Sequence, residues 1–251
     1  MLYIWHEDSK DSAATEFWCL LSEFIKEIKN IRIEGFNGNE NLKRHLEDVK
    51  NINLEDYYIV FVDAAYDNPK ALKVYESVVN IADKYKNIYV SDLYCFEFLL
   101  LSFQHLDVWL SVRNKRFWEV RNELIKAVNE GIESWEKSDI LKKFIEDYNI
   151  HRTKISKGKK VNLKITFEYL TAILLSQLSN NAYGDFEIGK TKLGSCWQTS
   201  CIKDKERNCS KCKIRIYNKT QKEKANNLWN CTKAKSIILK AKLFFINKQR
   251  K

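Results

Sequence analysis

Short apolar segments alternate with longer amphipathic segments through the first 110 residues, and this alternation constrains the fold more than any other feature. The expected strands cover residues 2–7, 31–36, 57–63 and 87–92. The expected helices cover residues 13–29, 40–50, 69–85 and 95–110. Apolar residues recur three and four positions apart in the helices, whereas 57–63 is a continuous apolar run of the kind found in covered parallel strands. We therefore expect an α/β fold with a parallel sheet between helical layers, of the Rossmann type.

Acidic residues follow three of these strands. Glu7 closes the first, Asp63 the third and Asp92 the fourth. The carboxyl ends of parallel strands share one edge of the sheet, and strands one and three are often neighbours in doubly wound sheets. We therefore expect Glu7 and Asp63 to meet, with Asp67 and Glu97 near the same edge. Clustered carboxylates repel one another unless a cation binds, and Mg²⁺ prefers one or two carboxylates together with waters and phosphate oxygens.

This pattern resembles the TOPRIM domain of topoisomerases, primases and the overcoming-lysogenization-defect nucleases. The resemblance rests on Glu7, Asp63 and Asp67, and Glu97 in the segment Y-C-F-E-F-L-L-L is similar to the additional helical glutamate of the nuclease branch. It implies a TOPRIM-like α/β domain over residues 1–112. It also implies that these four acids are catalytic and hold Mg²⁺ for strand cleavage or phosphoryl transfer.

The receiver domain of response regulators is an alternative resemblance. Glu7, Asp8 and Asp63 fit its acidic pattern, and Ser91 fits its hydroxyl position. That resemblance implies transfer of a phosphoryl group to Asp63, but the lysine that usually follows the fifth strand is not identifiable after Asp92.

Charge divides the chain into two unlike halves. Residues 151–251 contain 24 lysines and arginines against 6 acidic residues, whereas residues 1–150 contain 19 against 27. Such asymmetry indicates that a polyanion-binding part is joined to a different part.

Four cysteines of the basic half form a compact cluster. Cys196, Cys201, Cys209 and Cys212 have the spacing C-x4-C-x7-C-x2-C. Four thiolates suit a closed tetrahedral Zn²⁺ site, whose binding energy would fold a loop poor in apolar residues. An iron–sulfur cluster and unligated or disulfide-linked cysteines are the alternatives, and Cys231 could replace one of the four ligands.

Cations and aromatic residues surround this cluster. The expected contacts with nucleic acid are Trp197, Lys203, Lys205, Arg207, Lys211, Lys213 and Arg215. Cations neutralise phosphates and aromatic rings can stack on bases, which predicts binding of DNA or RNA.

These features predict three regions. The α/β domain occupies 1–112, a helical extension 113–150, and a basic, mainly helical region 151–251, which begins with a linker at 151–160 and contains the metal-binding loop within 190–231. We expect a Mg²⁺-dependent nuclease or another phosphodiester-processing enzyme; the alternative is a non-catalytic nucleic-acid-binding or interaction protein built on a degenerate α/β scaffold. With no apolar run of membrane-spanning length and no secretory signal, a cytoplasmic location and no membrane partner are expected.

Overall fold

The computed structural model describes residues 1–25, 30–109, 113–148, 153–156, 159–162, 164–176 and 220–249. Its first half contains β1 (Leu2–His6), α1 (Ala13–Ile25), β2 (Ile31–Gly35), α2 (Asn39–Glu47), the 3-10 turn η1 (Val49–Asn51), β3 (Tyr57–Phe61), α3 (Pro69–Ala82), β4 (Ile88–Val90), α4 (Phe96–Leu101) and α5 (Leu106–Trp109). Its second half contains α6 (Lys115–Asn129), the 3-10 turn η2 (Trp135–Lys137), α7 (Asp139–Asp147), β5 (Thr153–Ser156), β6 (Lys159–Asn162), α8 (Phe167–Ser176), α11 (Gln221–Cys231) and α12 (Ala234–Gln249).

The four expected strands form one parallel sheet in the order β2-β1-β3-β4. β1 therefore lies between β2 and β3, with His6 aligned to Gly35 on one side and to Phe61 on the other. The chain moves outward from β1 to β2 and then crosses back to β3. The strand order thus reverses between β1 and β3, which is where doubly wound sheets usually bind ligands, outside the carboxyl ends of the strands.

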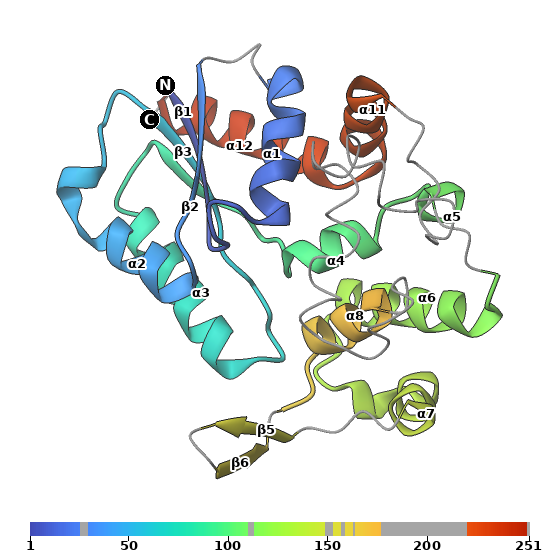
Figure 1. Ribbon diagram of the computed structural model, residues 1–251. Helices are drawn as coiled ribbons and strands as arrows, with labels where there is room; N and C mark the ends of the chain where they lie inside the picture. The colour runs from blue at the N-terminus through green and yellow to red at the C-terminus, as the bar shows by residue number, and fades with distance from the viewer. Residues whose placement is uncertain are drawn as a thin grey trace.

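Helices cover both faces of the sheet. Side chains alternate along each strand, so each strand places apolar residues on both faces. Ile4 and Ile59 face a core that includes buried residues of α1 and α12, whereas Trp5 and Val60 face a core with α2 and α3. Figure 1 shows α2 and α3 on one side of the sheet and α1 and α12 on the other. The expected α/β class with a helical C-terminal part is confirmed.

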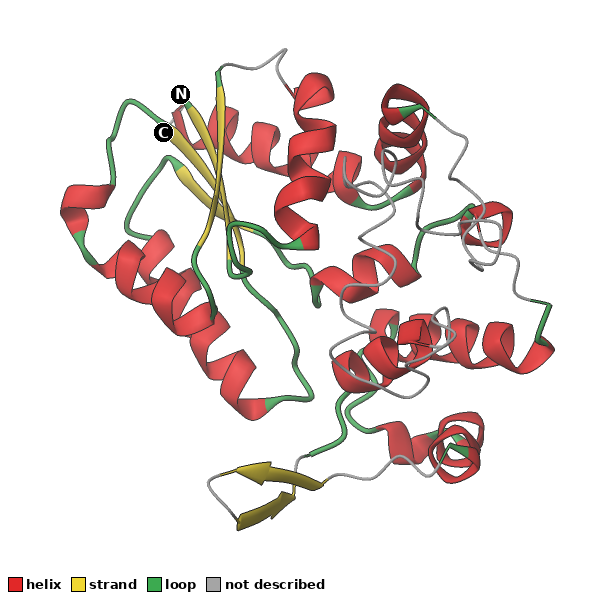
Figure 2. Ribbon diagram, viewed as in Figure 1, coloured by secondary structure: helices red, strands yellow, loops and turns green. Residues whose placement is uncertain are grey.

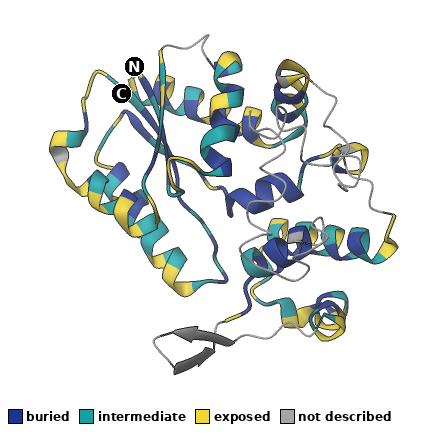
Figure 3. Cartoon of the chain, in the orientation of Figure 1, coloured by how far each residue is buried: buried dark blue, intermediate teal, exposed yellow. Residues whose placement is uncertain are grey.

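Residues from all three expected regions share the larger core. It joins Phe98 of α4, Phe117 of α6, Phe167 of α8 and Ile237 of α12. α4 lies at its centre, and all six of its residues are buried, as the dark blue ribbon in Figure 3 shows. The later helices therefore pack as part of the same apolar interior as the sheet.

Two expected elements differ in the structure. The helix expected over 95–110 is two helices, α4 and α5, because the run of apolar residues ends at Ser102 and Gln104 donates its backbone N–H to the carbonyl of Cys231 instead. The linker expected over 151–160 contains the antiparallel hairpin β5–β6, in which Thr153 pairs with Asn162. Figure 2 shows this hairpin away from the main sheet. Its Thr153, Ile155 and Val161 are β-branched residues, which favour strands.

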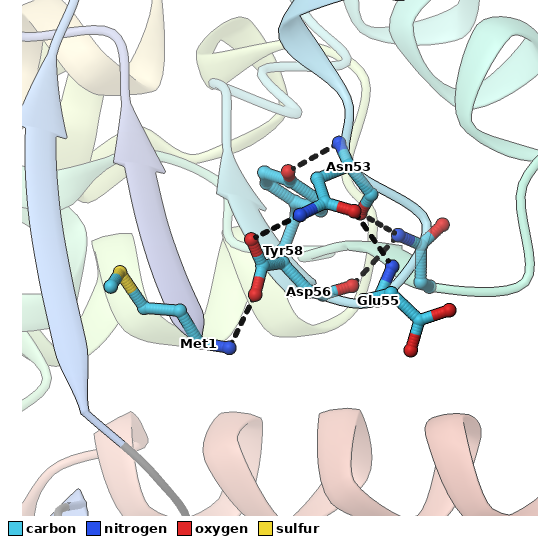
Figure 4. A network of polar contacts seen from close by, with 6 residues as sticks. Met1, Asn53, Glu55, Asp56 and Tyr58 are labelled. Atoms are coloured by element: carbon cyan, nitrogen blue, oxygen red, sulfur yellow. Dashed lines mark hydrogen bonds and ion pairs between the residues drawn. The ribbon is translucent and has the colours of Figure 1, made fainter.

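Polar contacts hold the amino end of the sheet. The amino group of Met1 pairs with Asp56, and Asn53 Nδ2 donates to the other oxygen of the same carboxylate at 3.2 Å (Figure 4). The Tyr58 hydroxyl accepts from the Asn53 backbone N–H at 2.8 Å. The amino edge of the sheet is thus closed by structural contacts, so we look for a functional site at the carboxyl edge.

Among the described residues, no helix is both long enough and apolar enough to span a bilayer.

Candidate acidic site at the carboxyl edge of the sheet

Backbone hydrogen bonds bring the ends of the strands together. The N–H of Glu7 donates to the carbonyl of Phe61 at 3.2 Å, and the N–H of Ala64 donates to the carbonyl of Leu93 at 3.1 Å. These contacts fix Glu7 beside the end of β3, where Asp63 follows two residues after Phe61. The prediction that strands one and three bring Glu7 and Asp63 together is confirmed.

Asp63 is the centre of a group of four carboxylates. Burial raises its pKa well above the ordinary value, and Glu7, which is within hydrogen-bonding reach, raises it further. Glu168 and Glu97 also raise the pKa of Asp63 through charge repulsion. Among the described residues, every influence on Asp63 therefore disfavours its ionised form, and none of these influences comes from a cation. We call Glu7, Asp63, Glu97 and Glu168 the acidic cluster.

Each member of the acidic cluster comes from a different element. Glu7 follows β1, Asp63 follows β3, and Glu97 lies in the first turn of α4, where it is 4% exposed. Glu168 lies in the first turn of α8, a helix of the basic half. The site thus combines the sheet edge with a helix that begins about 100 residues after β3.

A cleft of about 540 Å³ opens beside the acidic cluster. Its lining residues are Glu7, Asp8, Ser9, Asn37, Gly38, Asn39, Asp63, Asn68, Ala71 and Glu168. Asn37 and Gly38 adopt positive φ angles of 57° and 119°, which turn the chain sharply from β2 into α2 at the rim of the cleft. The cleft is therefore bordered by carboxylate and amide groups at the reversal of strand order.

Asp67 is not among the influences on Asp63. It is buried, at 5% exposure, and both of its oxygens accept hydrogen bonds: Oδ1 from the Tyr94 hydroxyl and Oδ2 from the backbone N–H of Phe167 at 2.7 Å. Asp67 therefore binds the start of α8 and is not a member of the acidic cluster.

His6 is buried beside the cluster. It is 2% exposed, and burial lowers its pKa to about 4, so the ring is neutral at physiological pH. Nε2 lies 3.0 Å from the Thr15 hydroxyl, and Nδ1 is a buried atom without a hydrogen-bond partner. His6, Glu7 and Asp63 also line a small internal cavity of about 20 Å³, which is enough for one water. A strand-end histidine next to Glu7 is more often solvated, whereas the structure buries this one.

Cys95 lies against the acidic cluster and remains a thiol. Burial raises its pKa well above the ordinary value, and Glu97, Asp63 and Glu168 raise it further. Its Sγ accepts the backbone N–H of Phe98 at 3.4 Å and so caps α4. Because the thiolate is the nucleophilic form, a neutral Cys95 serves the structure as a cap.

Glu168 is the acidic residue that sequence reasoning missed. Glu168 is one of six acidic residues in 151–251, a region whose expected function rests on its cysteines and basic residues. A single carboxylate within the run F-E-Y-L-T-A-I-L-L is the signal that could have identified it.

Cys196, Cys201, Cys209 and Cys212 lie outside the described residues, as do Trp197, Lys203, Lys205, Arg207, Lys211, Lys213 and Arg215. Cys231 is described: it ends α11, is partly buried and forms no disulfide. Across the described ranges, no three His, Cys, Asp or Glu side chains already converge as ligands of one metal ion.

Comparison with known proteins gives no match. No protein-family model matches the chain, and no curated protein or solved structure is similar to it.

Proposed function

We propose that this chain is a divalent-cation-dependent enzyme that acts on phosphodiester bonds of DNA or RNA at the acidic cluster. The observation that carries the proposal is the convergence of Glu7, Glu97 and Glu168 on the partly buried Asp63, at the reversal of strand order. A structural role alone gives no reason to gather three further carboxylates around Asp63, where all three raise its pKa.

The donor set fits Mg²⁺ or Mn²⁺. Both ions prefer oxygen ligands, and Mg²⁺ needs only one or two carboxylates because waters and substrate phosphates fill the remaining positions. Binding of Mg²⁺ therefore does not require three protein side chains already arranged as ligands. Glu7 and Asp63 would hold the cation, with Glu97 and Glu168 beside it. The bound ion would polarise a phosphoryl oxygen and an attacking water.

A second cleft supports an anionic substrate. It has a volume of about 500 Å³ and is lined by Ala64, which directly follows Asp63, and by Lys233 and Lys240 of the C-terminal region. Lys233 Nζ lies 2.9 Å from Asn129 Oδ1, and Lys240 Nζ lies 3.0 Å from the exposed carboxylate of Asp92. Two lysines thus line a cleft that includes the residue next to Asp63, and they could contact a phosphate of a polynucleotide bound at the acidic cluster.

Phosphoryl acceptance of the receiver type has less support. Ser91 would supply the hydroxyl group of such a site, but its side chain is fully buried and its Oγ accepts the backbone N–H of Leu93 at 3.2 Å. That hydroxyl group is held by the β4–α4 connection instead of facing the cleft.

The test combines Glu7→Gln with Asp63→Asn in the full chain. We expect the double variant to lose both the rise in melting temperature caused by millimolar Mg²⁺ or Mn²⁺ and the cation-dependent cleavage of DNA and RNA, while oligonucleotide binding persists. The control, Glu55→Gln with Asp83→Asn, removes two exposed carboxylates elsewhere. Unchanged cleavage in the Glu7/Asp63 double variant would reject this site, and wild-type protein that neither binds the cation nor cleaves any polynucleotide would favour a non-catalytic scaffold.

For the basic half we propose structural Zn²⁺ on Cys196, Cys201, Cys209 and Cys212. The spacing of the thiols and the lysines around them support it. Elemental analysis of the purified chain is expected to find one zinc, which Cys209→Ser with Cys212→Ser removes and Cys19→Ser retains. Iron in place of zinc, or no metal, would overturn this assignment.

A further inference from the structure

Asp67 connects the loop after β3 to the start of α8. Its Oδ2 accepts the backbone N–H of Phe167 at 2.7 Å, and Lys164 Nζ donates to its carbonyl oxygen at 2.7 Å. The first N–H groups of a helix have no partner within the helix, so a buried carboxylate that accepts one of them both satisfies it and complements the helix dipole. Asp67 therefore caps α8 from a remote part of the chain.

Tyr94 completes this connection. Its hydroxyl donates to Asp67 Oδ1 and accepts the backbone N–H of Glu168 at 3.2 Å. Tyr94 is 5% exposed, so both contacts are shielded from water. Two consecutive N–H groups of the first turn of α8 are thus held by two residues that follow strands of the sheet.

The residue fixed by these contacts is Glu168. Its side chain lines the same cleft as Glu7 and Asp63, and its charge acts on both Asp63 and Cys95. A shift of α8 would move this carboxylate away from the other acids while leaving Glu7 and Asp63 in place on the sheet.

We propose that Asp67 and Tyr94 are positioning residues, which hold Glu168 against Glu7 and Asp63 so that α8 completes a site for a hard divalent cation, Mg²⁺ or Mn²⁺. This inference rests on the proposed function. It assigns Asp67 a role in holding a ligand residue, in place of the direct ligand role that the TOPRIM resemblance implies.

A separate observation at His6 supports a bound water or ligand beside Glu7 and Asp63. The buried Nδ1 of His6 has no hydrogen-bond partner, and His6 lines the 20 Å³ cavity together with Glu7 and Asp63. Buried polar atoms are usually satisfied by protein or ordered water, so this atom requires a water or another ligand in the cavity.

The test measures Mn²⁺ affinity of the full chain by calorimetric titration, at a temperature where every variant is folded. Glu168→Gln is expected to weaken binding about tenfold, and Asp67→Asn to weaken it to a similar degree, which is the size typical of residues that orient metal ligands. The double variant is expected to bind no more weakly than Glu168→Gln, because residues acting through one another are not additive.

Tyr94→Phe provides a milder variant should Asp67→Asn fold poorly, and it is expected to weaken Mn²⁺ binding severalfold. Tyr66→Phe is the matched control, since the Tyr66 ring is a neighbour of the Tyr94 ring, at 5.5 Å between centroids, but its hydroxyl donates to the carbonyl of Ala127. A lower melting temperature with unchanged Mn²⁺ affinity in Asp67→Asn and Tyr94→Phe would overturn the proposal, as would additive effects in the double variant.

The Glu7→Gln/Asp63→Asn variant separates this inference from the proposed function. If that variant loses Mn²⁺ while Glu168→Gln binds normally, the cation site exists but α8 does not complete it. If the Glu7/Asp63 variant binds Mn²⁺ as well as the wild type, the proposed function itself fails.

Discussion

The side chain of Asp67 accepts the backbone N–H of Phe167 at 2.7 Å, so a residue of the sheet edge caps a helix that begins 100 positions later. Helices usually receive a cap from the residue just before them. In α8 the nearby Thr166 hydroxyl accepts the N–H of Tyr169 at 3.1 Å, whereas Tyr94 accepts that of Glu168 and Asp67 that of Phe167. The conformation of the loop after β3 is therefore coupled to the position of α8.

Removing the Tyr94 hydroxyl should destabilise the fold. Tyr94→Phe leaves Asp67 Oδ1 and the N–H of Glu168 without this buried partner, so we expect the free energy of unfolding to fall by about 2–3 kcal/mol. Urea denaturation measures the loss. Tyr66→Phe removes a hydroxyl that donates to the neutral carbonyls of Ala127 and Val128, so it should cost about 1 kcal/mol. Equal losses in the two variants would contradict a special role for the Tyr94 hydroxyl.

Gly35→Ala should disturb both stability and cation binding. A Cβ at Gly35 would lie 2.4 Å from the carbonyl oxygen of Asp8, in the loop that carries Glu7, so this backbone must move. We expect a loss of about 1–3 kcal/mol in urea denaturation and weaker Mn²⁺ binding. Gly131→Ala meets no atom within 4 Å but has a φ of +67°, so it should cost about 1 kcal/mol and leave Mn²⁺ affinity unchanged.

His45 should make the fold less stable in acid. Burial against Trp5 and Phe36 lowers the pKa of His45 below 6.5, although Glu34 and Asp48 oppose the shift. The unfolded chain therefore takes up this proton first, and the contribution of neutral His45 to stability is present above pH 6.5 and is lost as the pH falls below it.

The variant His45→Phe keeps an aromatic ring but cannot titrate. The unfolding free energy of the wild type minus that of the variant should fall between pH 8 and pH 5 by up to about 1 kcal/mol, because the ring is partly exposed. Urea denaturation at a series of pH values measures this difference, and a difference independent of pH would contradict the prediction.

Lys233 and Lys240 should contribute to polynucleotide affinity through charge. Each phosphate contact contributes about 0.9 to the slope of log affinity against log salt concentration, so Lys233→Gln and Lys240→Gln should each lower that slope by about 1. Fluorescence anisotropy with a labelled oligonucleotide gives the slope. Lys142→Gln, which removes a surface lysine paired with Asp139 on α7, is the control, and an equal effect there would exclude a specific role for the cleft.

The sheet could be predicted from sequence because its signals are local. The apolar run at β3 and the helix start at Asn68-Pro69 each lie within a few residues, and the Asn68 side chain does accept the N–H groups of Lys70 and Ala71. The meeting of Glu7 and Asp63 also followed, because strand order in doubly wound sheets places the first and third strands side by side.

The contribution of α8 could not be predicted in this way. Hydrogen bonds between residues 74 to 100 positions apart place Glu168 in the acidic cluster and direct the Asp67 side chain to α8 instead. No local sequence spacing indicates these hydrogen bonds. The lysines of 151–160 indicate a linker, and the β-branched residues Thr153 and Ile155 are too short a pattern to indicate the hairpin β5–β6.

The position of α12 has a consequence for biosynthesis. Phe245 packs on Tyr57 of β3, with ring centroids 4.8 Å apart, and belongs to the same core as Leu2 and Ile4 of the first strand. While the ribosome is still adding the second half of the chain, α1 can cover this face of the sheet, but the part that packs on α12 stays exposed. Such exposed surfaces promote aggregation, so the protein should depend on chaperones until its last described helix has emerged.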